Sequence, residues 1–385
     1  MTMQQLVSDA ARQSLGRGAA GQALFCIEQA RAGEGSWPKA HEHVMRMSAA
    51  PISAHATSGL FQGAPAIAYV LASAEQAAYE PALSTLDSYI DKLTRERVRQ
   101  GHQRIDSGLP PHLREFDLLS GLTGLGVYQL RRRCGDDVLT EVLHYLVRLC
   151  QPLTSDGLPG WWTANDTADL PSGHWPGGHG NFGVAHGISG PLALMALAAR
   201  HGIQVAGQLD AIHAICSWLD RWQQGDGEAA WWPGTITTHE FESKRLGHLG
   251  PQRPSWCYGT PGIARAQQLA GIALNDTERQ HLAESVLHGC ITDASQLAQL
   301  SDTSLCHGWA GLTQATRRVT ADAGPDSPLV SALPELVLRL NELVRADESQ
   351  GRAELLEGSS GVRLVQVSVA SAVESVWDAC LLLSG

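Results

Sequence analysis

The feature that most constrains the fold of this chain is a short glycine motif that occurs six times. A Gly-x-x-Gly step followed by an apolar run begins at Gly63, Gly121, Gly187, Gly259, Gly308 and Gly358. Only the first copy departs from the pattern, with Ala66 in place of the second glycine. Successive copies lie 49 to 72 residues apart, which leaves room for two helices and a loop in each unit. Such a repeat indicates helical units that bury their apolar faces against one another.

Two kinds of helix alternate along this repeat. The segments that follow the glycines, such as "PLALMALAA", are apolar on nearly every side and should be buried all round. The segments between them are amphipathic, with apolar residues at helical spacing, as at Leu83, Leu86, Ile90 and Leu93. The repeat carries no heptad, which argues against a parallel coiled array of helices. We therefore predict an all-α (α/α) barrel, or toroid, in which six or seven helical hairpins place an inner ring of helices inside an outer ring.

In such a toroid the glycine motifs start the inner helices at one end of the ring, and glycine lets the backbone turn sharply there. The residues just before the motifs should then line a common cavity. The position directly before the first glycine is held by Gln62, Ser120, His186, Tyr258, His307 and Glu357. The position before that is held by Phe61, Leu119, Ala185, Cys257, Cys306 and Leu356. We expect the chemistry of the protein among these residues.

The composition excludes several classes of function. The 385 residues carry a formal net charge of −11 and no basic cluster beyond three arginines at 131–133, which argues against nucleic-acid binding. The N-terminal residues hold no apolar core of signal-peptide length, and no stretch approaches 18 apolar residues, so we expect no transmembrane segment. We therefore expect a cytoplasmic protein whose eight cysteines are mostly reduced.

Two cysteines stand at the same step of consecutive repeats, and a histidine follows the second. Cys257, Cys306 and His307 together offer two thiolates and an imidazole, which is a good ligand set for Zn2+. Three protein ligands leave the fourth position of the metal open, as in catalytic zinc sites. Because two thiolates cancel the charge of the ion, a substrate thiolate bound there would stay nucleophilic. The alternative is structural, with two buried cysteines and a capping histidine.

Five stretches of the sequence resemble signature motifs of the lanthionine synthetase C-like family, namely "REFDLLSGLTG", "GNFGVAHGISG", "SWCYGTPG", "LCHGWAG" and "LLEGSSG". The resemblance extends over about residues 59–365 and implies an α/α toroid with a central zinc ion. Bacterial members of this family are cyclases, which add peptide cysteine thiols to dehydroalanine or dehydrobutyrine and so form thioether rings. The chain is too short to include the dehydratase domain of the bifunctional synthetases, so it looks like a stand-alone cyclase with one domain over residues 1–385.

The resemblance also implies roles for individual residues and partners. It implies that Cys257, Cys306 and His307 are the zinc ligands, and that the remaining active-site residues are His186, Asp117 and Arg253. It implies that the substrate is a dehydrated precursor peptide with a leader and a Cys-containing core. A separate dehydratase and a transporter are further candidate partners, in a biosynthetic complex that could bring a cytoplasmic protein to the membrane.

Residue chemistry supports some of these roles and leaves an alternative for each. The reaction needs a thiolate and then a proton for the α-carbon of an enolate, and histidine is a suitable acid–base group. His186 could instead hydrogen-bond to loop carbonyls. Asp117 could cap its inner helix, and Arg253 could be a solvated loop residue instead of stabilising the enolate charge. His174 and His179 lie near His186 in the sequence, and we assign neither a role.

Two irregular segments interrupt the helical rhythm, at about residues 155–181 and 225–247. Both are rich in Gly, Pro and Trp, and the β-branched residues of "TITTHEF" favour a strand. We expect a small β-containing extension here, which could act as a lid or dock a peptide. The alternative is that the tryptophans only pack the loops onto the barrel.

Other functions remain open on the sequence alone. A prenyltransferase-like protein also activates a thiol on zinc in an α/α toroid, but it uses an Asp-Cys-His set. An (α/α)6 glycosidase could use Asp117 and Glu357 as its two carboxylates, but it leaves the cysteines unexplained. A third alternative is a thiol-binding protein without biosynthetic activity, since eukaryotic relatives bind glutathione.

Overall fold

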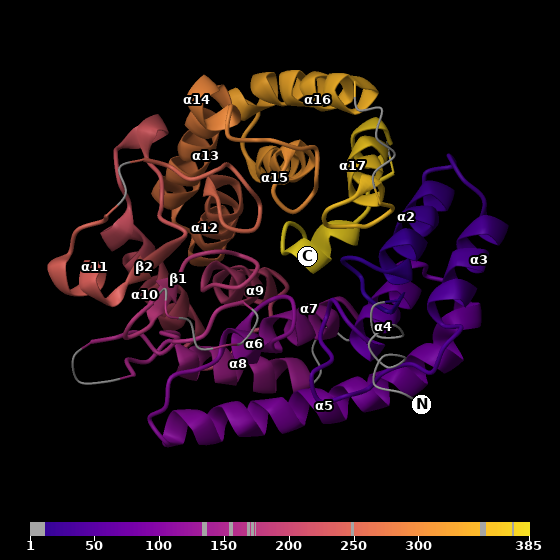
Figure 1. Cartoon of the computed structure of the whole chain (residues 1–385), viewed down its shortest axis with the longest axis horizontal. Helices are drawn as coiled ribbons and strands as arrows, with labels where there is room; N and C mark the ends of the chain where they lie inside the picture. The colour runs from indigo at the N-terminus through magenta and orange to yellow at the C-terminus, as the bar shows by residue number, and fades with distance from the viewer. Residues whose placement is uncertain are drawn as a thin grey trace.

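The computed structural model describes residues 12–132, 137–153, 157–167, 170, 173, 175–247, 250–346, 352–371 and 373–385. Among these residues, seven helices form a closed inner ring in which each helix contacts the next and the last contacts the first (Figure 1). The inner helices are α2 (Ala19–Arg31), α4 (Ala64–Ser73), α7 (Leu122–Arg132), α9 (Ser189–Arg200), α12 (Thr260–Leu274), α15 (Trp309–Asp322) and α17 (Ser359–Ala370). Most of their residues are buried, as the apolar runs predict, although α2 and α17 are less covered than the others.

Every inner helix except α17 is followed by an outer helix that packs against it. Within the described residues the outer helices are α3 (Trp37–Met47), α5 (Glu80–Asp106), α8 (Asp137–Leu149), α10 (Gln208–Trp222), α13 (Thr277–Thr292) and α16 (Pro328–Ala346). The shorter elements are α6 (Leu113–Phe116), α11 (Thr238–Ser243), α14 (Ala294–Leu297), η1 (Ala77–Tyr79), η2 (Gly227–Ala229), η3 (Trp377–Leu381), β1 (His179–Asn181) and β2 (Thr235–Thr237). The predicted α/α toroid is confirmed.

The six-fold sequence pattern omits one inner helix. Helix α2 also starts at a Gly-x-x-Gly step, from Gly18 to Gly21, and lies between α17 and α4. This copy precedes Gly63 by only 45 residues, which is closer than any other pair of copies. The residue directly before its first glycine is Arg17, which therefore joins the set of side chains around the predicted cavity.

The second glycine of the motif allows each inner helix to start against the loop that precedes it. A Cβ atom on Gly311 would lie 2.1 Å from the carbonyl oxygen of Leu305, and one on Gly361 would lie 1.9 Å from that of Leu355. In both cases the carbonyl belongs to the residue six positions earlier. Because a backbone atom cannot rotate away, only glycine fits at these positions.

We expect Gly361→Ala to lower the free energy of unfolding by about 1–3 kcal/mol, because the added methyl group must displace the Leu355 carbonyl or the start of α17. Urea unfolding measures the change. Gly324→Ala is the control, since a Cβ atom at Gly324 meets open space. Equal losses in the two variants would contradict this role of the second glycine.

The loops before the inner helices, which we call the glycine loops, are joined in a closed ring of backbone hydrogen bonds. Each loop donates an N–H to a carbonyl of the next, at 2.8–3.3 Å: Leu15 to Phe61, Phe61 to Leu119, Leu118 to Ala185, Ala185 to Cys257, Cys257 to Cys306, Cys306 to Leu356, and Leu356 to Gly16. All these residues stand at or beside the same step of the repeat. The ring therefore fixes how the seven loops sit beside one another at one end of the toroid.

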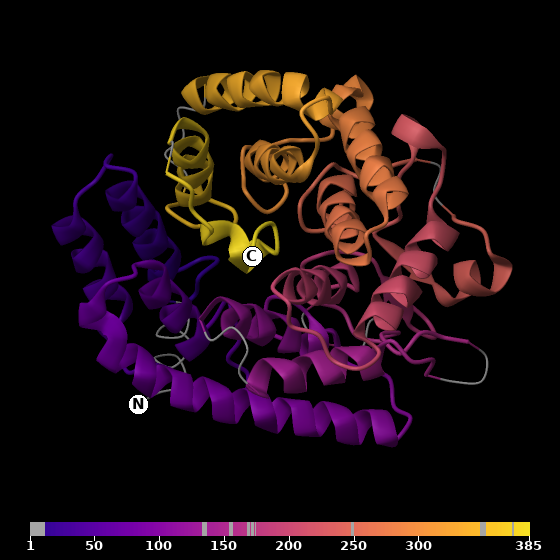
Figure 2. The same ribbon diagram turned by 180° about the vertical axis from the view of Figure 1, so that it is seen from behind.

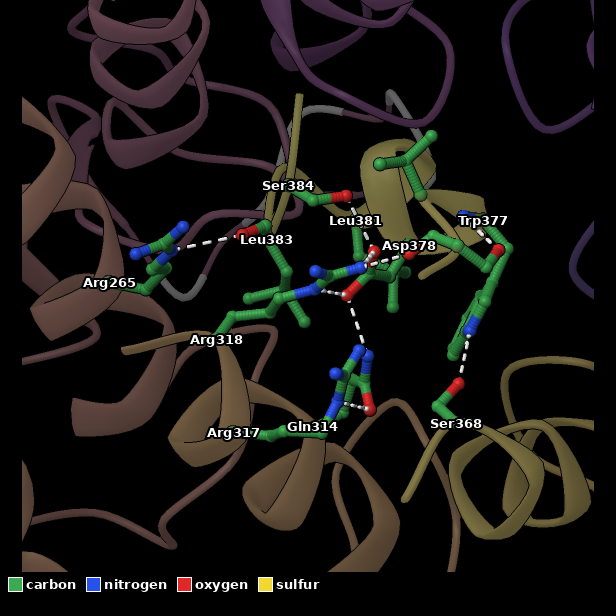
Figure 3. A network of polar contacts seen from close by, with 12 residues as sticks. Arg265, Gln314, Arg317, Arg318, Ser368, Trp377, Asp378, Leu381, Leu383 and Ser384 are labelled. Atoms are coloured by element: carbon green, nitrogen blue, oxygen red, sulfur yellow. Dashed lines mark hydrogen bonds and ion pairs between the residues drawn. The ribbon is translucent and has the colours of Figure 1, made fainter. Parts of the chain in front are cut away.

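The C-terminal segment, residues 377–384, fills the centre of the ring and is buried (Figures 1 and 2). Asp378 accepts two hydrogen bonds from Arg318, at 2.7 Å each, and one from Gln314 at 2.6 Å (Figure 3). Burial alone would raise the pKa of Asp378, but the charge of Arg318 and the hydrogen bonds to the carboxylate hold it below its ordinary value.

The C-terminal segment also contacts an inner helix and a glycine loop. Arg265 donates from Nε to the carbonyl of Leu383 at 3.0 Å (Figure 3). The indole of Trp256 donates to the carbonyl of Leu381 at 2.9 Å. Since Trp256 directly precedes Cys257, the C-terminal segment forms a floor under the loop that carries this cysteine.

The two irregular segments form a small extension on α10. Strands β1 and β2 pair antiparallel, with Gly180 opposite Ile236, and the strand expected in "TITTHEF" is thus confirmed over Thr235–Thr237. The Trp218 ring of α10 lies 5.7 Å from Trp161 and 5.9 Å from Phe241. The tryptophans of this region therefore pack the extension onto the barrel.

His179 is a buried histidine of this extension. It lies on β1, is fully buried, and stacks on Trp175 at 4.0 Å. Burial lowers its pKa to about 4, whereas an exposed histidine titrates near pH 6.5. Protonation is therefore favoured in the unfolded chain over this interval.

We expect the protonation of His179 to leave the free energy of unfolding unchanged above about pH 6.5. As the pH drops towards 4, this protonation should lower the free energy of unfolding by up to about 3 kcal/mol. Chemical denaturation of the wild type and of His179→Phe across this range isolates the contribution of His179. The variant should lose that part of the pH dependence. Identical pH profiles would contradict the assignment.

Two further expectations concern the whole chain. None of the helices in the described ranges has both the length and the apolar character that a membrane span requires. The cysteines of the described residues are all free thiols, as expected from the sequence.

Candidate active site

The ring of glycine loops brings Cys257 and Cys306 together. The two residues are joined by the backbone hydrogen bond from Cys257 N to Cys306 O, at 3.3 Å, and their thiols are close enough to shift each other's pKa. The Cys306 thiol lowers the pKa of Cys257 to about 7 despite burial, with help from Ser255 and the charge of Arg253. Ser255 Oγ lies 3.6 Å from Cys257 Sγ. The Cys257 thiol in turn raises the pKa of Cys306, so Cys257 is the thiol of the pair that loses its proton more readily.

His307 follows Cys306 but is turned toward a carboxylate. Its Nε2 atom lies 3.4 Å from Oδ2 of Asp302. In the part of the chain that the structure describes, no three His, Cys, Asp or Glu side chains are gathered closely enough to hold a metal ion. The structure thus forms the predicted cysteine pair and does not complete the three-residue set.

The next two glycine loops around the ring bring His186 and Asp117 together. His186 Nδ1 lies 2.6 Å from Oδ2 of Asp117, whose side chain is fully buried. The other oxygen, Oδ1, accepts the backbone N–H groups of Ser120 at 2.8 Å and Gly121 at 2.7 Å. The carboxylate therefore caps the turn before α7 and also fixes the tautomer of His186.

Arg97 stands behind this pair and is a residue that the sequence did not single out. From the outer helix α5 it donates hydrogen bonds to the carbonyls of Ser120 and Ala56. Burial lowers its pKa to about 10, and the nearby Asp117 carboxylate opposes that shift. The guanidinium thus supplies a positive charge near the buried carboxylate. Nothing in the sequence distinguishes Arg97 from the other arginines of "RERVR".

Tyr258 lies beside one residue of the cysteine pair and one residue of the Asp117–His186 pair. It follows Cys257 in the chain, its ring centroid lies 6.3 Å from that of His186, and its hydroxyl accepts a hydrogen bond from Asn181 at 3.3 Å. Burial raises its pKa, and the charges of Cys257, Asp117 and Cys306 act in the same direction. The hydroxyl therefore stays protonated beside both pairs.

The sequence also singled out Arg253 and Glu357. Arg253 is half-buried and lies close enough to the thiols for its charge to lower the pKa of both. Glu357 forms an ion pair with Arg17 at 2.9 Å. The two carboxylates considered for a glycosidase thus have different partners, Arg17 for Glu357 and His186 for Asp117.

The sequence assigned no role to His174 or His179. His179 packs in the extension, against Trp175, and pairs across the sheet with Thr237. His174 lies outside the described residues.

Comparisons with known proteins agree with this architecture. A family model described as "Lanthionine synthetase C-like protein" matches residues 9–382. The "Nisin biosynthesis protein NisC" of Lactococcus lactis subsp. lactis is 24% identical over 338 residues, which cover 85% of this chain and 78% of that protein. A solved structure named "Nisin cyclase" superposes with a TM-score of 0.82 at 22% identity, and covers 99% of this chain and 95% of its own. This likeness shows the fold.

Proposed function

Since the chain belongs to the lanthionine synthetase C-like family, we propose that it is a zinc-dependent cyclase that forms lanthionine and methyllanthionine thioether rings in a dehydrated peptide. The relative named as a nisin biosynthesis protein and the structure named as a nisin cyclase support this activity. One observation carries the proposal: the Asp117–His186 pair and the Cys257–Cys306 pair stand on four consecutive loops of one hydrogen-bonded ring.

The two cysteines and the histidine would supply the donor atoms of a zinc site. Cys257 and Cys306 are free thiols on neighbouring loops of the ring, and sulfur is a favoured ligand of Zn2+. His307 adds an imidazole from the residue next to Cys306, with a carboxylate on its Nε2 atom. When bound, zinc would lower the pKa of a substrate thiol and keep the resulting thiolate nucleophilic, because two cysteine thiolates neutralise the charge of the ion.

The overall reaction is the addition of a thiol across a carbon–carbon double bond. The substrate sulfur forms a bond to Cβ of the dehydroamino acid, the π bond breaks, and its electron pair moves toward the carbonyl as an enolate. A proton then binds Cα. The thiol proton balances the Cα proton, so the addition needs no oxidant or reductant.

In this proposal His186 moves the proton. Asp117 Oδ2 accepts from His186 Nδ1, which leaves Nε2 to take a proton from the thiol and to return one to Cα. Asp117 also stabilises the imidazolium form between these two transfers. Arg253, which lies near the thiols, would stabilise the negative charge of the enolate.

The floor of the ring limits the directions from which a substrate can reach these groups. The C-terminal segment fills the centre of the toroid, and Trp256 bonds it to the loop of Cys257. A peptide would therefore reach the site from the end of the ring where the glycine loops lie. The proposal includes a precursor peptide as substrate, and a dehydratase as the enzyme class that must supply the dehydroamino acids.

The test is a reaction with a defined peptide. Purified protein loaded with zinc is incubated with a peptide that holds one cysteine and one dehydroalanine, and unreacted thiols are alkylated and counted by mass spectrometry. We expect loss of the free thiol without a change of mass, since addition conserves all atoms. A reaction that consumes glutathione or a prenyl donor, with the peptide unchanged, would support one of the alternative functions instead.

A further inference from the structure

Arg97 reaches from the outer helix α5 to two neighbouring glycine loops. Its Nε atom donates to the carbonyl oxygen of Ala56 at 3.0 Å, and its Nη1 atom donates to the carbonyl oxygen of Ser120. Ala56 lies in the segment that leads to α4, and Ser120 lies directly before α7. The guanidinium therefore joins the two loops through their backbones.

The carbonyl that Arg97 binds belongs to the same peptide group as an N–H that binds Asp117. The peptide bond between Ser120 and Gly121 is planar and trans, so its C=O and its N–H point in opposite directions. The N–H of Gly121 donates to Asp117 Oδ1 at 2.7 Å, while Arg97 donates to the oxygen at the other end. Because the peptide group is rigid, its orientation determines both contacts at once.

The carboxylate held by this peptide is the one that contacts His186. Asp117 Oδ1 accepts the N–H groups of Ser120 and Gly121, and Oδ2 lies 2.6 Å from His186 Nδ1. The direction of Oδ2 therefore depends on how Oδ1 is anchored. Hydrogen bonds thus run without a gap from the guanidinium, through one peptide group and one carboxylate, to the imidazole.

Packing and charge add to this connection. A Cβ atom on Gly59 would lie 2.6 Å from the Cα atom of Ser120, so the loop before α4 also presses directly on the residue that Arg97 holds. Asp117 is fully buried, and a buried carboxylate is costly unless donors and positive charge compensate it. Arg97 is close enough to Asp117 for the two charges to attract each other.

We propose that Arg97 is a positioning residue for proton transfer, which fixes the Ser120–Gly121 peptide and, through it, the carboxylate that orients His186. The proposal rests on the function proposed above, in which His186 moves the proton. A planar guanidinium suits this position because its N–H groups can bind two carbonyls at fixed angles, which the ammonium group of a lysine does less well.

The test replaces Arg97 with methionine, which removes the charge and the N–H donors and keeps an unbranched side chain. We expect kcat for addition of the thiol to dehydroalanine to fall about 10²-fold with KM nearly unchanged, because a small misplacement of a catalytic group can cost this much. The matched control is Arg95→Met on the same helix. Arg95 forms an exposed ion pair with Glu141 at 3.0 Å, so this variant should stay close to the wild type.

A second readout does not depend on activity. Nitrogen NMR of the full chain with 15N-labelled histidine reports which ring nitrogen carries the proton when the imidazole is neutral, and the spectrum of His186→Asn identifies the signals of His186. We expect the proton on Nδ1 in the wild type and a mixture of both tautomers in Arg97→Met. Thermal melting of the same samples measures stability, which by itself leaves the tautomer unchanged.

The outcomes separate this proposal from the proposed function. A His186 tautomer in Arg97→Met that equals the wild-type one would overturn the role of Arg97 and leave the proposed function standing. A changed tautomer, in a protein whose wild type adds no thiol to the peptide, would support the role of Arg97 in orienting His186 and overturn the proposed function. If Arg97→Met does not fold, Arg97→Lys provides the test, because it keeps the charge and loses the planar donor group. We then expect a smaller fall in kcat and a shift of the tautomer in the same direction, and an unchanged tautomer would again overturn the role.

Discussion

Replacing Cys306 with alanine should remove both the bound zinc and the thioether-forming activity. The variant leaves Cys257 without the neighbour that lowers its pKa to about 7, and it removes one of the two proposed sulfur ligands. We expect the loss of zinc affinity to exceed the roughly 10–100-fold cost of losing a residue that only orients a ligand. Zinc content after dialysis and mass-spectrometric counting of unreacted peptide thiols measure the two effects.

The control for this variant is Cys290→Ala. Cys290 lies on α13, is buried, and burial raises the pKa of its thiol, as for an inert core cysteine. This change should cost some stability through lost packing and leave zinc content and cyclisation intact. If Cys306→Ala kept full zinc and full activity, the cysteine pair would be a structural feature.

Replacing Asp117 with asparagine should lower the rate of cyclisation by about 10²–10⁴-fold while the protein stays folded and keeps its zinc. The amide oxygen can still accept the N–H groups of Ser120 and Gly121. The amide nitrogen, however, would donate to His186 Nδ1, which reverses the tautomer and places the proton on Nε2. His186 then cannot accept a proton at Nε2, the atom that the proposed reaction uses.

Asp117→Ala separates the capping contacts from the proton-transfer role. It removes the acceptor for two buried N–H groups and should lower the free energy of unfolding by at least about 1 kcal/mol, in addition to the loss of activity. Thermal melting and zinc content accompany the thiol assay for both variants. An Asn variant with wild-type activity would show that Asp117 only caps the turn before α7.

The sequence predicted the toroid because a repeated motif records a repeated structure. The Gly-x-x-Gly steps mark the starts of inner helices, where the carbonyl six residues earlier, as at Leu305 and Leu355, leaves no room for a side chain. The copy at Gly18 is harder to recognise because it lies closer to the next copy than any other pair does. The central position of residues 377–384 was also unpredictable, since their partners lie up to 311 residues away.

Within the candidate site, the sequence predicted which residues lie on the glycine loops. It did not predict which of their side chains contact one another. The neighbouring positions of Cys257 and Cys306 follow from equivalent steps of consecutive repeats. The contacts of Asp117 and Asp302 depend on which carboxylate oxygen faces the backbone and which faces a histidine. The role of Arg97 depends on a long side chain that crosses from the outer ring. No local pattern records such geometry.

Zinc K-edge X-ray absorption of the purified full-length protein, with the metal content measured on the same sample, tests the central claim most directly. We predict one zinc ion per chain with two sulfur neighbours at about 2.3 Å and at least one nitrogen neighbour at about 2.0–2.1 Å, assigned to Cys257, Cys306 and His307. Well under one zinc per chain, or a bound zinc with no sulfur neighbours, would contradict it.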